Sequence, residues 1–251
     1  MIDMLIILLT LSFSCIFLLV IYMIYLNKLI DKLEKKIDTL QYQTDDVLHD
    51  INIVNENVLN AYGLLCEMKW KTKIIIMNEI LKNKNILFCD LDGTLIETIS
   101  GDTFPKGIWD MKLRFDVLDA IKKLNPEYVL IVSNQGGIES GFVDAKKFKT
   151  KLFYIVESIG EYCGCECYAM YCDTNNKSDP YRKPNTKMLE TLLEDYVGYD
   201  FECFKHEILM IGDASGKEGQ FSDSDKKTAE NFGIDYMDVN DFVNALLWTK
   251  I

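Results

Sequence analysis

Asp90 and Asp92 stand on either side of Leu91, directly after the apolar run 86–89 and before Gly93. A short apolar run of this kind indicates a buried parallel strand, and open α/β sheets place their ligands at the carboxyl ends of such strands. Two carboxylates this close would repel each other unless a cation lay between them, and their oxygen atoms suit Mg²⁺. One carboxylate could then attack phosphorus while the other handles a proton. A simple turn before a glycine is the alternative.

Three later clusters place polar side chains after predicted strands in the same way. A hydroxyl and an amide follow the second strand, two cations precede a proline after the third, and a carboxylate with a nearby cation follows the fourth. Such groups can donate hydrogen bonds to a phosphate, neutralise its charge or add a metal ligand, although each alone also fits a turn or a solvated helix cap. In order, they are Ser133 and Asn134, Arg182 and Lys183, and Asp213 and Lys217. The acidic stretch from Asp223 to Asp225 is expected to include a helix cap.

Strand and helix patterns alternate from about Asn85 to the end of the chain. This order predicts an α/β fold with a doubly wound, mostly parallel sheet and helices on both faces. The intervals 97–132 and 139–181 are filled by a short flap and by single helices and strands, so we expect no cap domain and a site open to a macromolecular end. The predicted strands are 86–89, 128–132, 166–171, 207–211 and 234–236, and the predicted helices are 116–124, 145–159, 186–196, 225–232 and 239–247.

Taken together, the four clusters resemble the haloacid dehalogenase (HAD) superfamily of phosphotransferases. Within it, the stretches Tyr181-Arg-Lys-Pro, Phe221-Ser-Asp-Ser-Asp and Phe104-Pro105 make the region from Asn85 to the carboxyl terminus similar to the polynucleotide kinase 3′-phosphatase family. The resemblance implies a HAD-like fold and a Mg²⁺-dependent phosphatase that removes 3′-phosphate from polynucleotide ends, as in DNA repair. One departure concerns Trp109-Asp110, because the family tends to have Asp-Trp at this place.

The resemblance also implies a role for each motif residue. Asp90 would be the nucleophile, and Asp92 would be the acid that protonates the leaving sugar oxygen and then the base that activates water. Mg²⁺ would be held by Asp90, Asp213 and the backbone carbonyl of Asp92. The phosphate-binding candidates are Ser133, Asn134 and Lys183, and the candidate substrate contacts are Arg182 and Lys217.

The overall charge limits how a nucleic acid would be bound. The formal net charge is -12, from 27 basic and 39 acidic residues. Long-range attraction to a phosphate backbone or an anionic lipid would have the wrong sign, so a polynucleotide end must meet a local basic cleft. Two other functions stay open: a phosphatase of small metabolites, of the histidinol-phosphate or heptose-bisphosphate type, and a catalytically silent membrane scaffold. The presence of every motif residue disfavours the scaffold.

The eight cysteines of the chain show no disulfide framework, and we expect reduced thiols. A zinc site is the alternative for the four that cluster before Tyr181, and it would favour the metabolite phosphatase. Three of these alternate along or beside one strand, which cannot readily wrap a tetrahedral ion, so we expect small packing residues instead. The four are Cys163, Cys165, Cys167 and Cys172.

The amino-terminal segment Met4–Leu26 is almost entirely apolar and carries no charge. About 20 such residues span a bilayer as a helix, which predicts a transmembrane anchor over residues 1–27. A cleaved signal peptide fits less well, because no basic residue precedes the run and no small-residue cleavage site follows it. Lysines after Leu26 predict that the amino terminus faces outward and that the phosphatase domain is cytoplasmic.

A seven-residue apolar rhythm continues from Ile30 to Leu65 and predicts a coiled-coil stalk over residues 28–66. Copies anchored in the same membrane would pair in parallel as a homo-oligomer. A single amphipathic helix that packs on its own catalytic domain is the alternative. Residues 67–84 are predicted to be a linker, and residues 85–251 to be the phosphatase domain.

Overall fold

The computed structural model describes residues 18–28, 32, 44–101, 110–198, 201–220 and 222–248. The chain divides into two compact units, Met1–Ile75 and Ile76–Ile251. The long helix α2 (Thr44–Leu81) contributes residues to both units. It continues without a break through most of the predicted linker 67–84.

In the first unit, residues 18–28 form a helix, and α2 begins at Thr44. Most of the apolar segment Met4–Leu26 lies outside the described residues, as do the heptad positions from Ile30 to Leu40. Across the described ranges, no helix has both the length and the apolar character that crossing a membrane requires. On α2 the heptad position Val54 is buried, whereas Leu59, which is not a heptad position, is 71% exposed. The coiled-coil stalk and the parallel homo-oligomer stay predictions.

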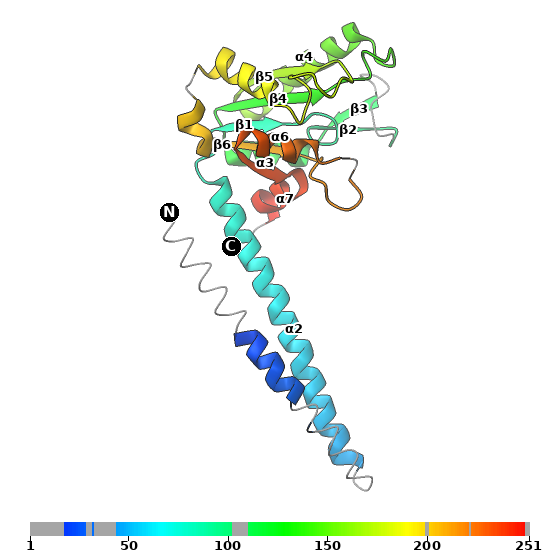
Figure 1. Cartoon of the computed structure of the whole chain (residues 1–251), viewed down its shortest axis with the longest axis vertical. Helices are drawn as coiled ribbons and strands as arrows, with labels where there is room; N and C mark the ends of the chain where they lie inside the picture. Colours follow the sequence, from blue (N-terminus) through cyan, green and yellow to red (C-terminus); the bar gives the residue numbers. More distant parts are fainter. Residues whose placement is uncertain are drawn as a thin grey trace. The chain divides into compact units, whose positions relative to one another are not determined.

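The second unit is built on a parallel sheet of five strands in the order β5-β4-β1-β6-β7 (Figure 1). Every neighbouring pair in this sheet is parallel, which confirms the predicted α/β architecture. Each predicted strand is present, with ends shifted by at most two residues. The strands are β1 (Ile86–Cys89), β4 (Tyr128–Asn134), β5 (Glu166–Cys172), β6 (Ile208–Gly212) and β7 (Asp235–Asp238).

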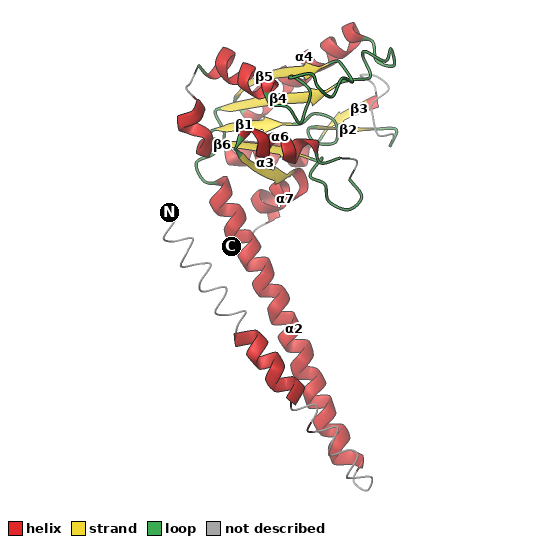
Figure 2. Ribbon diagram, in the orientation of Figure 1, coloured by secondary structure: helices red, strands yellow, loops and turns green. Residues whose placement is uncertain are grey.

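Helices cover both faces of this sheet (Figure 2). One face packs against α3, α4 and α7, and the other packs against α5 and α6. The predicted helix 186–196 changes at Leu193 from α-helical to π-helical hydrogen bonding, and a second π-helical turn follows α7. The helices are α3 (Phe115–Leu124), α4 (Ala145–Cys163), α5 (Lys187–Leu192), α6 (Ser224–Phe232) and α7 (Val239–Val243).

Successive side chains of each strand point to opposite faces of the sheet, so every strand contributes to the hydrophobic core on each face. In β1, Leu87 and Cys89 enter the core beneath α3 and α4, whereas Ile86 and Phe88 enter the core beneath α5. All four are at least 96% buried. Burying a Leu, Ile or Phe side chain completely stabilises a fold by about 1.5–3 kcal/mol, so this central strand is firmly held in register.

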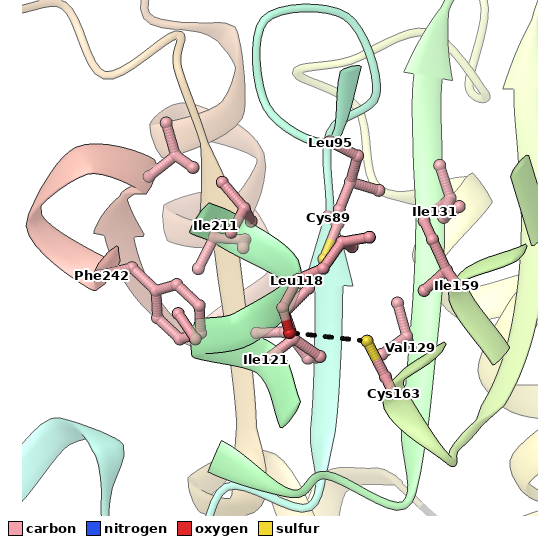
Figure 3. Packing of buried hydrophobic residues seen from close by; sticks show 14 of the residues in the cluster. Cys89, Leu95, Leu118, Ile121, Val129, Ile131, Ile159, Cys163, Ile211 and Phe242 are labelled. Atoms are coloured by element: carbon pink, nitrogen blue, oxygen red, sulfur yellow. Dashed lines mark hydrogen bonds between the residues drawn. The ribbon is translucent and has the colours of Figure 1, made fainter. Parts of the chain in front are cut away.

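The core beneath α3 and α4 also fixes these two helices against each other (Figure 3). Leu118 and Ile121 of α3 meet Ile159 of α4, and the thiol of Cys163 donates a hydrogen bond to the carbonyl oxygen of Leu118 at 3.7 Å. Cys163 is therefore a small packing residue, as the sequence predicts.

A two-stranded antiparallel hairpin, β2 (Ile96–Thr98) and β3 (Met111–Leu113), stands apart from the main sheet in the place of the predicted flap. Its closing loop contains Phe104-Pro105 and Trp109, which lie outside the described residues. Asp110 joins the two sides of the hairpin, because its carboxylate accepts hydrogen bonds from the backbone and the hydroxyl of Ser100 at 2.7 and 2.9 Å. The described residues between β1 and β4, and between β4 and α5, form no further domain that could act as a cap.

Candidate active site

Asp90 and Asp213 lie side by side at the carboxyl edge of the sheet, where β1 and β6 end. The chain leaves β1 towards α3 on one face and leaves β6 towards α6 on the other, and such a divergence opens a crevice between neighbouring strands. The backbone N–H of Asp90 donates to the carbonyl of Ile211 at 3.0 Å, which extends the pairing of β1 and β6 to the first residue of the site.

A third carboxylate, Asp225 of α6, joins this pair. One oxygen from each of Asp90, Asp213 and Asp225 lies within 4.8 Å of the others. The ammonium group of Lys183 forms ion pairs with Asp90 and with Asp225, the latter at 2.7 Å. Three carboxylates and one ammonium have a formal charge of minus two when all are ionised, which is the charge that one divalent cation balances.

The pKa values in the cluster reflect burial first and the charges of neighbouring groups second. Burial raises the pKa of Asp90 well above its usual range, and the charge of Lys183 only partly opposes this. Burial and the charge of Asp225 raise the pKa of Asp213 to about 6. Burial alone would lower the pKa of Lys183, but the charges of Asp225 and Asp90 outweigh it and raise the value. The donor set therefore fits a hard divalent ion such as Mg²⁺.

Two glycines make room for these carboxylates. A Cβ atom on Gly93 would lie 2.2 Å from an oxygen of Asp213, and a Cβ atom on Gly212 would lie 2.2 Å from an oxygen of Asp225. Gly93 also has a φ of +86°, which favours glycine. Close packing of backbone against carboxylate thus defines the floor of the site.

Asp92 points to a different set of partners. The side-chain amide of Gln135 donates to Asp92 Oδ2 at 2.6 Å and to the hydroxyl oxygen of Ser133 at 2.8 Å. Asp92 Oδ1 is buried and has no hydrogen-bond partner, and Lys151 Nζ of α4 lies 3.7 Å from it. Gln135 therefore links the predicted proton donor to the predicted phosphate-binding hydroxyl.

Asn134 reaches the site through Lys183. Its side-chain amide donates to the backbone carbonyl of Lys183 at 3.0 Å, and its side-chain oxygen accepts from the backbone N–H of Lys183 at 2.9 Å. This two-point contact holds the loop that carries the ammonium group. Asn134 thus supports the backbone of Lys183, and its predicted phosphate contact stays a prediction.

Arg182 and Lys217 have their recorded partners outside the carboxylate cluster. The guanidinium of Arg182 donates to the carbonyl of Thr174 at 2.6 Å. The ammonium of Lys217 pairs with Asp238 at 3.1 Å and with Asp241 at 3.0 Å. The roles of Arg182 and Lys217 as substrate contacts stay predictions.

Sequence reasoning missed three residues of the site: Gln135, Lys151 and Asp225. The acidic stretch from Asp223 to Asp225 was expected to include a helix cap. Asp223 occupies the N-cap position of α6, but its side chain makes no capping hydrogen bond and pairs with Lys227 at 2.6 Å. The signal was available in the Ser222-Asp-Ser-Asp stretch, whose second acid enters the site.

The four cysteines of the cluster do not gather as a group of potential metal ligands in the described part of the chain. Within the described ranges, the aspartate trio is the one group of His, Cys, Asp or Glu side chains spaced to hold an ion. Cys163, Cys167 and Cys172 are buried free thiols, and Cys165 is half-buried.

Residues 85–242 match the family model described as polynucleotide kinase 3 phosphatase. The bifunctional polynucleotide phosphatase/kinase of Schizosaccharomyces pombe is 33% identical over 162 residues, which make up 63% of this chain and 37% of that protein. An uncharacterized 20.8 kDa protein in the FGF-VUBI intergenic region of Autographa californica nuclear polyhedrosis virus is 30% identical over 173 residues, or 64% of this chain and 87% of that protein. The histidine biosynthesis bifunctional protein HisB of Campylobacter jejuni is 28% identical over 177 residues, or 67% of this chain and 44% of that protein. The chain thus spans less than half the length of the Schizosaccharomyces and Campylobacter proteins.

Two solved phosphatase structures match about two thirds of this chain. D,D-heptose 1,7-bisphosphate phosphatase from B. bronchiseptica, complexed with magnesium and phosphate, has a TM-score of 0.45 and 18% identity, covering 65% of this chain and 98% of that chain. The enzyme of the same name from Burkholderia thailandensis has a TM-score of 0.36 and 17% identity, covering 67% of this chain and all of that chain.

Proposed function

The chain belongs to the polynucleotide kinase 3 phosphatase family, and from this premise we propose that it removes the terminal phosphate from the 3′ ends of polynucleotides. It is a HAD-family phosphatase and thus a hydrolase. The observation that carries the proposal is the gathering of Asp90, Asp213, Asp225 and Lys183 at the carboxyl ends of β1 and β6, with Asp92 beside them.

In the proposed first step, an oxygen of Asp90 attacks the phosphorus atom of the terminal phosphate. The bond between phosphorus and the sugar 3′ oxygen breaks, and Asp92 gives its proton to that oxygen. The product is an aspartyl-phosphate on Asp90 and a free 3′-hydroxyl. Splitting one difficult displacement into two easier ones is the gain of covalent catalysis.

In the second step, water attacks the phosphorus of the aspartyl-phosphate while Asp92 takes up the proton of that water. The bond between phosphorus and Asp90 breaks, inorganic phosphate leaves, and both carboxyl groups return to their starting states. Ser133 and Lys183 would bind the phosphoryl oxygens in both steps. A Mg²⁺ ion held by Asp90, Asp213, Asp225 and the backbone carbonyl of Asp92 would reduce the repulsion between phosphate and carboxylate when bound.

Two observations support a macromolecular substrate. The family is described by its action on polynucleotides, and the described residues form no cap over the carboxyl edge of the sheet. A terminal phosphate on a long chain can approach such an open edge, whereas a cap would enclose a small metabolite. The acidic composition of the chain requires the contact to be local, so we expect recognition of one or a few nucleotides.

The test compares phosphate release by the full-length protein, in the presence of Mg²⁺, from four substrates. These are an oligonucleotide with a 3′-phosphate, the same oligonucleotide with a 5′-phosphate, histidinol phosphate and an aryl phosphate. We expect preferential release from the 3′ end, and loss of that release in Asp90→Asn. Turnover of histidinol phosphate with no oligonucleotide preference would establish a metabolite phosphatase instead. Absence of turnover on all four would favour a silent scaffold.

A separate proposal concerns the amino-terminal segment. We propose that Met4–Leu26 anchors the chain in a membrane, since it contains no charged residue over a length that spans a bilayer. Lysines that follow it favour a cytoplasmic phosphatase domain. The expected result is that the full chain stays in the membrane fraction after alkaline carbonate washing, whereas a chain with Leu8, Leu18 and Ile21 changed to Asp is released.

A further inference from the structure

We propose that Lys151 is a positioning residue that holds the carboxylate of Asp92 in the orientation needed for proton transfer. This inference rests on the proposed function, because it assigns Lys151 to the step that Asp92 performs there. It concerns a residue of α4 that none of the motifs contains.

The two oxygens of Asp92 have different surroundings. Oδ2 accepts a hydrogen bond from Gln135 at 2.6 Å. Oδ1 is buried without a hydrogen-bond partner, and Lys151 Nζ faces it at 3.7 Å. The ammonium group thus stands on the side of the carboxylate that Gln135 leaves open. A hydrogen bond on one side and an ammonium charge on the other restrict rotation about the Cβ–Cγ bond of Asp92, so they favour one direction for its proton.

Lys151 is buried, so its charge requires a compensating interaction. The residue is 7% exposed on a helix face whose neighbours Phe148, Leu152 and Ile155 all enter the hydrophobic core. Placing an ammonium group there costs desolvation energy, which an apolar side chain would avoid. In the described part of the chain, Asp92 is the one acidic partner of Lys151. The ammonium also lies over the Phe148 ring, 5.1 Å from Nζ to the ring centroid.

One continuous segment of the chain delivers both groups that surround Asp92. Gln135 follows β4, and its backbone N–H donates to the carbonyl of Cys172 at 2.6 Å. The chain then turns into α4, where the carboxylate of Asp144 caps the first turn by accepting from the N–H of Lys147 at 2.8 Å. Lys151 lies in the second turn of this capped helix. Gln135 is therefore held at the end of β4 by a backbone hydrogen bond, and Lys151 is held by a capped helix.

The consequence for the reaction depends on the leaving group. A sugar alkoxide is a poor leaving group and needs the proton of Asp92 as the bond to phosphorus breaks. A nitrophenolate leaves readily without one. If Lys151 acts by orienting Asp92, its loss slows the first step for a 3′-phosphorylated end and barely affects the first step for nitrophenyl phosphate. A side chain needed only for folding would slow both alike.

The experiment measures the first turnover of Lys151→Met in the full-length protein. For the 3′-phosphorylated oligonucleotide we expect a loss of roughly tenfold to a hundredfold in the rate of 3′-hydroxyl formation, as small misplacements of catalytic groups cause, with KM unchanged. For nitrophenyl phosphate we expect the burst of nitrophenolate to slow by less than about threefold, because this leaving group draws little on general-acid catalysis. Lys149→Met, an exposed lysine on the same helix, should change neither rate.

Two further variants separate orientation from stability. On an Asp92→Asn background, Lys151→Met should cause no additional loss, since the group it orients no longer transfers a proton. Lys151→Arg keeps the charge and should restore part of the oligonucleotide rate. If Lys151→Met does not fold, as judged by thermal unfolding, Lys151→Gln takes its place in the same comparison.

Equal losses on both substrates would overturn the inference and make Lys151 a structural residue. A raised KM with an unchanged first-turnover rate would make it a substrate contact instead. Failure of the proposed function is distinguishable, because the unmodified protein would then release no phosphate from the 3′ end in the same assay.

Discussion

The carboxylate of Asp225 accepts a hydrogen bond from the backbone N–H of Ala214 at 3.1 Å. This contact fastens the first turn of α6 to the loop that leaves β6, where Asp213 stands. The second oxygen of Asp225 accepts from Lys183 at 2.7 Å. One buried side chain thus joins the loop after β6, the helix α6 and the lysine loop, so a change at any of the three should alter metal binding.

Removal of the Lys183 ammonium should make the fold depend on a metal ion. Lys183→Met leaves Asp90 and Asp225 buried without a cation, which costs about 3 kcal/mol for a broken buried pair. A divalent ion at a free concentration of a hundred times its dissociation constant stabilises the folded state by about 2.7 kcal/mol. Thermal unfolding with EDTA and with Mg²⁺ measures both effects. We expect a larger Mg²⁺-induced rise in Tm for Lys183→Met than for the unmodified protein.

Lys187→Met is the matched control for this experiment. Lys187 lies four residues after Lys183, and its ammonium pairs with the partly exposed carboxylate of Glu190 at 3.1 Å. Its removal should leave the unfolding temperature and its response to Mg²⁺ almost unchanged, because exposed ion pairs contribute little. Equal Mg²⁺ responses in the two variants would mean that Lys183 does not share the charge of the carboxylate cluster.

Gly212→Ala should weaken metal binding through a steric effect. The added Cβ would lie 2.2 Å from an oxygen of Asp225, whose side chain is held by Lys183 and Ala214 and cannot move away freely. We expect the Mg²⁺ concentration for half-maximal phosphate release to rise by about tenfold, equivalent to about 1.4 kcal/mol. Gly63→Ala is the control, because a Cβ at this exposed site of α2 meets nothing within 4 Å. An unchanged Mg²⁺ requirement in Gly212→Ala would show that Asp225 is not a ligand.

Mg²⁺ affinity should fall as the pH falls below 6. Asp213 has a pKa raised to about 6 by burial and by the charge of Asp225, so it binds a proton below that pH. The metal needs the ionised form and must displace this proton, which lowers the apparent affinity by about tenfold for each pH unit. The raised pKa of Asp90 acts in the same direction. Calorimetric titrations with Mg²⁺ at pH 5, 6 and 7 measure the slope, and a constant affinity would place the metal elsewhere.

Asp90→Asn should abolish phosphate release without loss of stability. An amide has the shape of the carboxylate but carries no charge. It removes both the cost of a buried charge and the repulsion from Asp225 and Asp213, which together raise the pKa of Asp90. Lys183 keeps Asp225 as its partner at 2.7 Å. In the absence of Mg²⁺ we expect an unfolding temperature equal to or above that of the unmodified protein. A marked drop in Tm would mean that the loss of activity reports damage to the fold.

The sheet could be predicted because its strands are continuous apolar runs. β1 has the predicted bounds Ile86–Cys89. Because β1 and β6 are parallel neighbours, Asp90 lies at the same edge of the sheet as the end of β6. The hairpin strands β2 and β3 could not be predicted, since three residues are too few to show an alternating pattern. The end of α5 could not be predicted either. The hydrogen bonding changes to π-helical at Leu193, but the spacing of apolar residues in the sequence does not change there.

Most of the predicted site residues lie at or just after the ends of strands, whereas two of the three missed residues come from helices. Gln135 is the exception, because it directly follows β4 and was still missed. Asp90 and Asp213 reach the crevice by extension of β1 and β6, and Lys183 by the loop after β5. Asp225 and Lys151 enter from the sides of α6 and α4, and their places depend on how those helices pack against the sheet. A lysine among apolar residues on α4 was the available signal for Lys151, since a charge on a buried face requires a partner.

The central place of β1 also governs how the protein is made. β1 is the first strand of the main sheet to leave the ribosome, yet its two neighbours begin only at Tyr128 and Ile208. Until β6 emerges, one edge of β1 stays unpaired, and nascent sheets with open edges are prone to misassembly. If synthesis pauses before residue 208, the sheet is incomplete and the edge of β1 that later pairs with β6 is exposed next to Asp90. We therefore expect the nascent chain to bind chaperones during its synthesis.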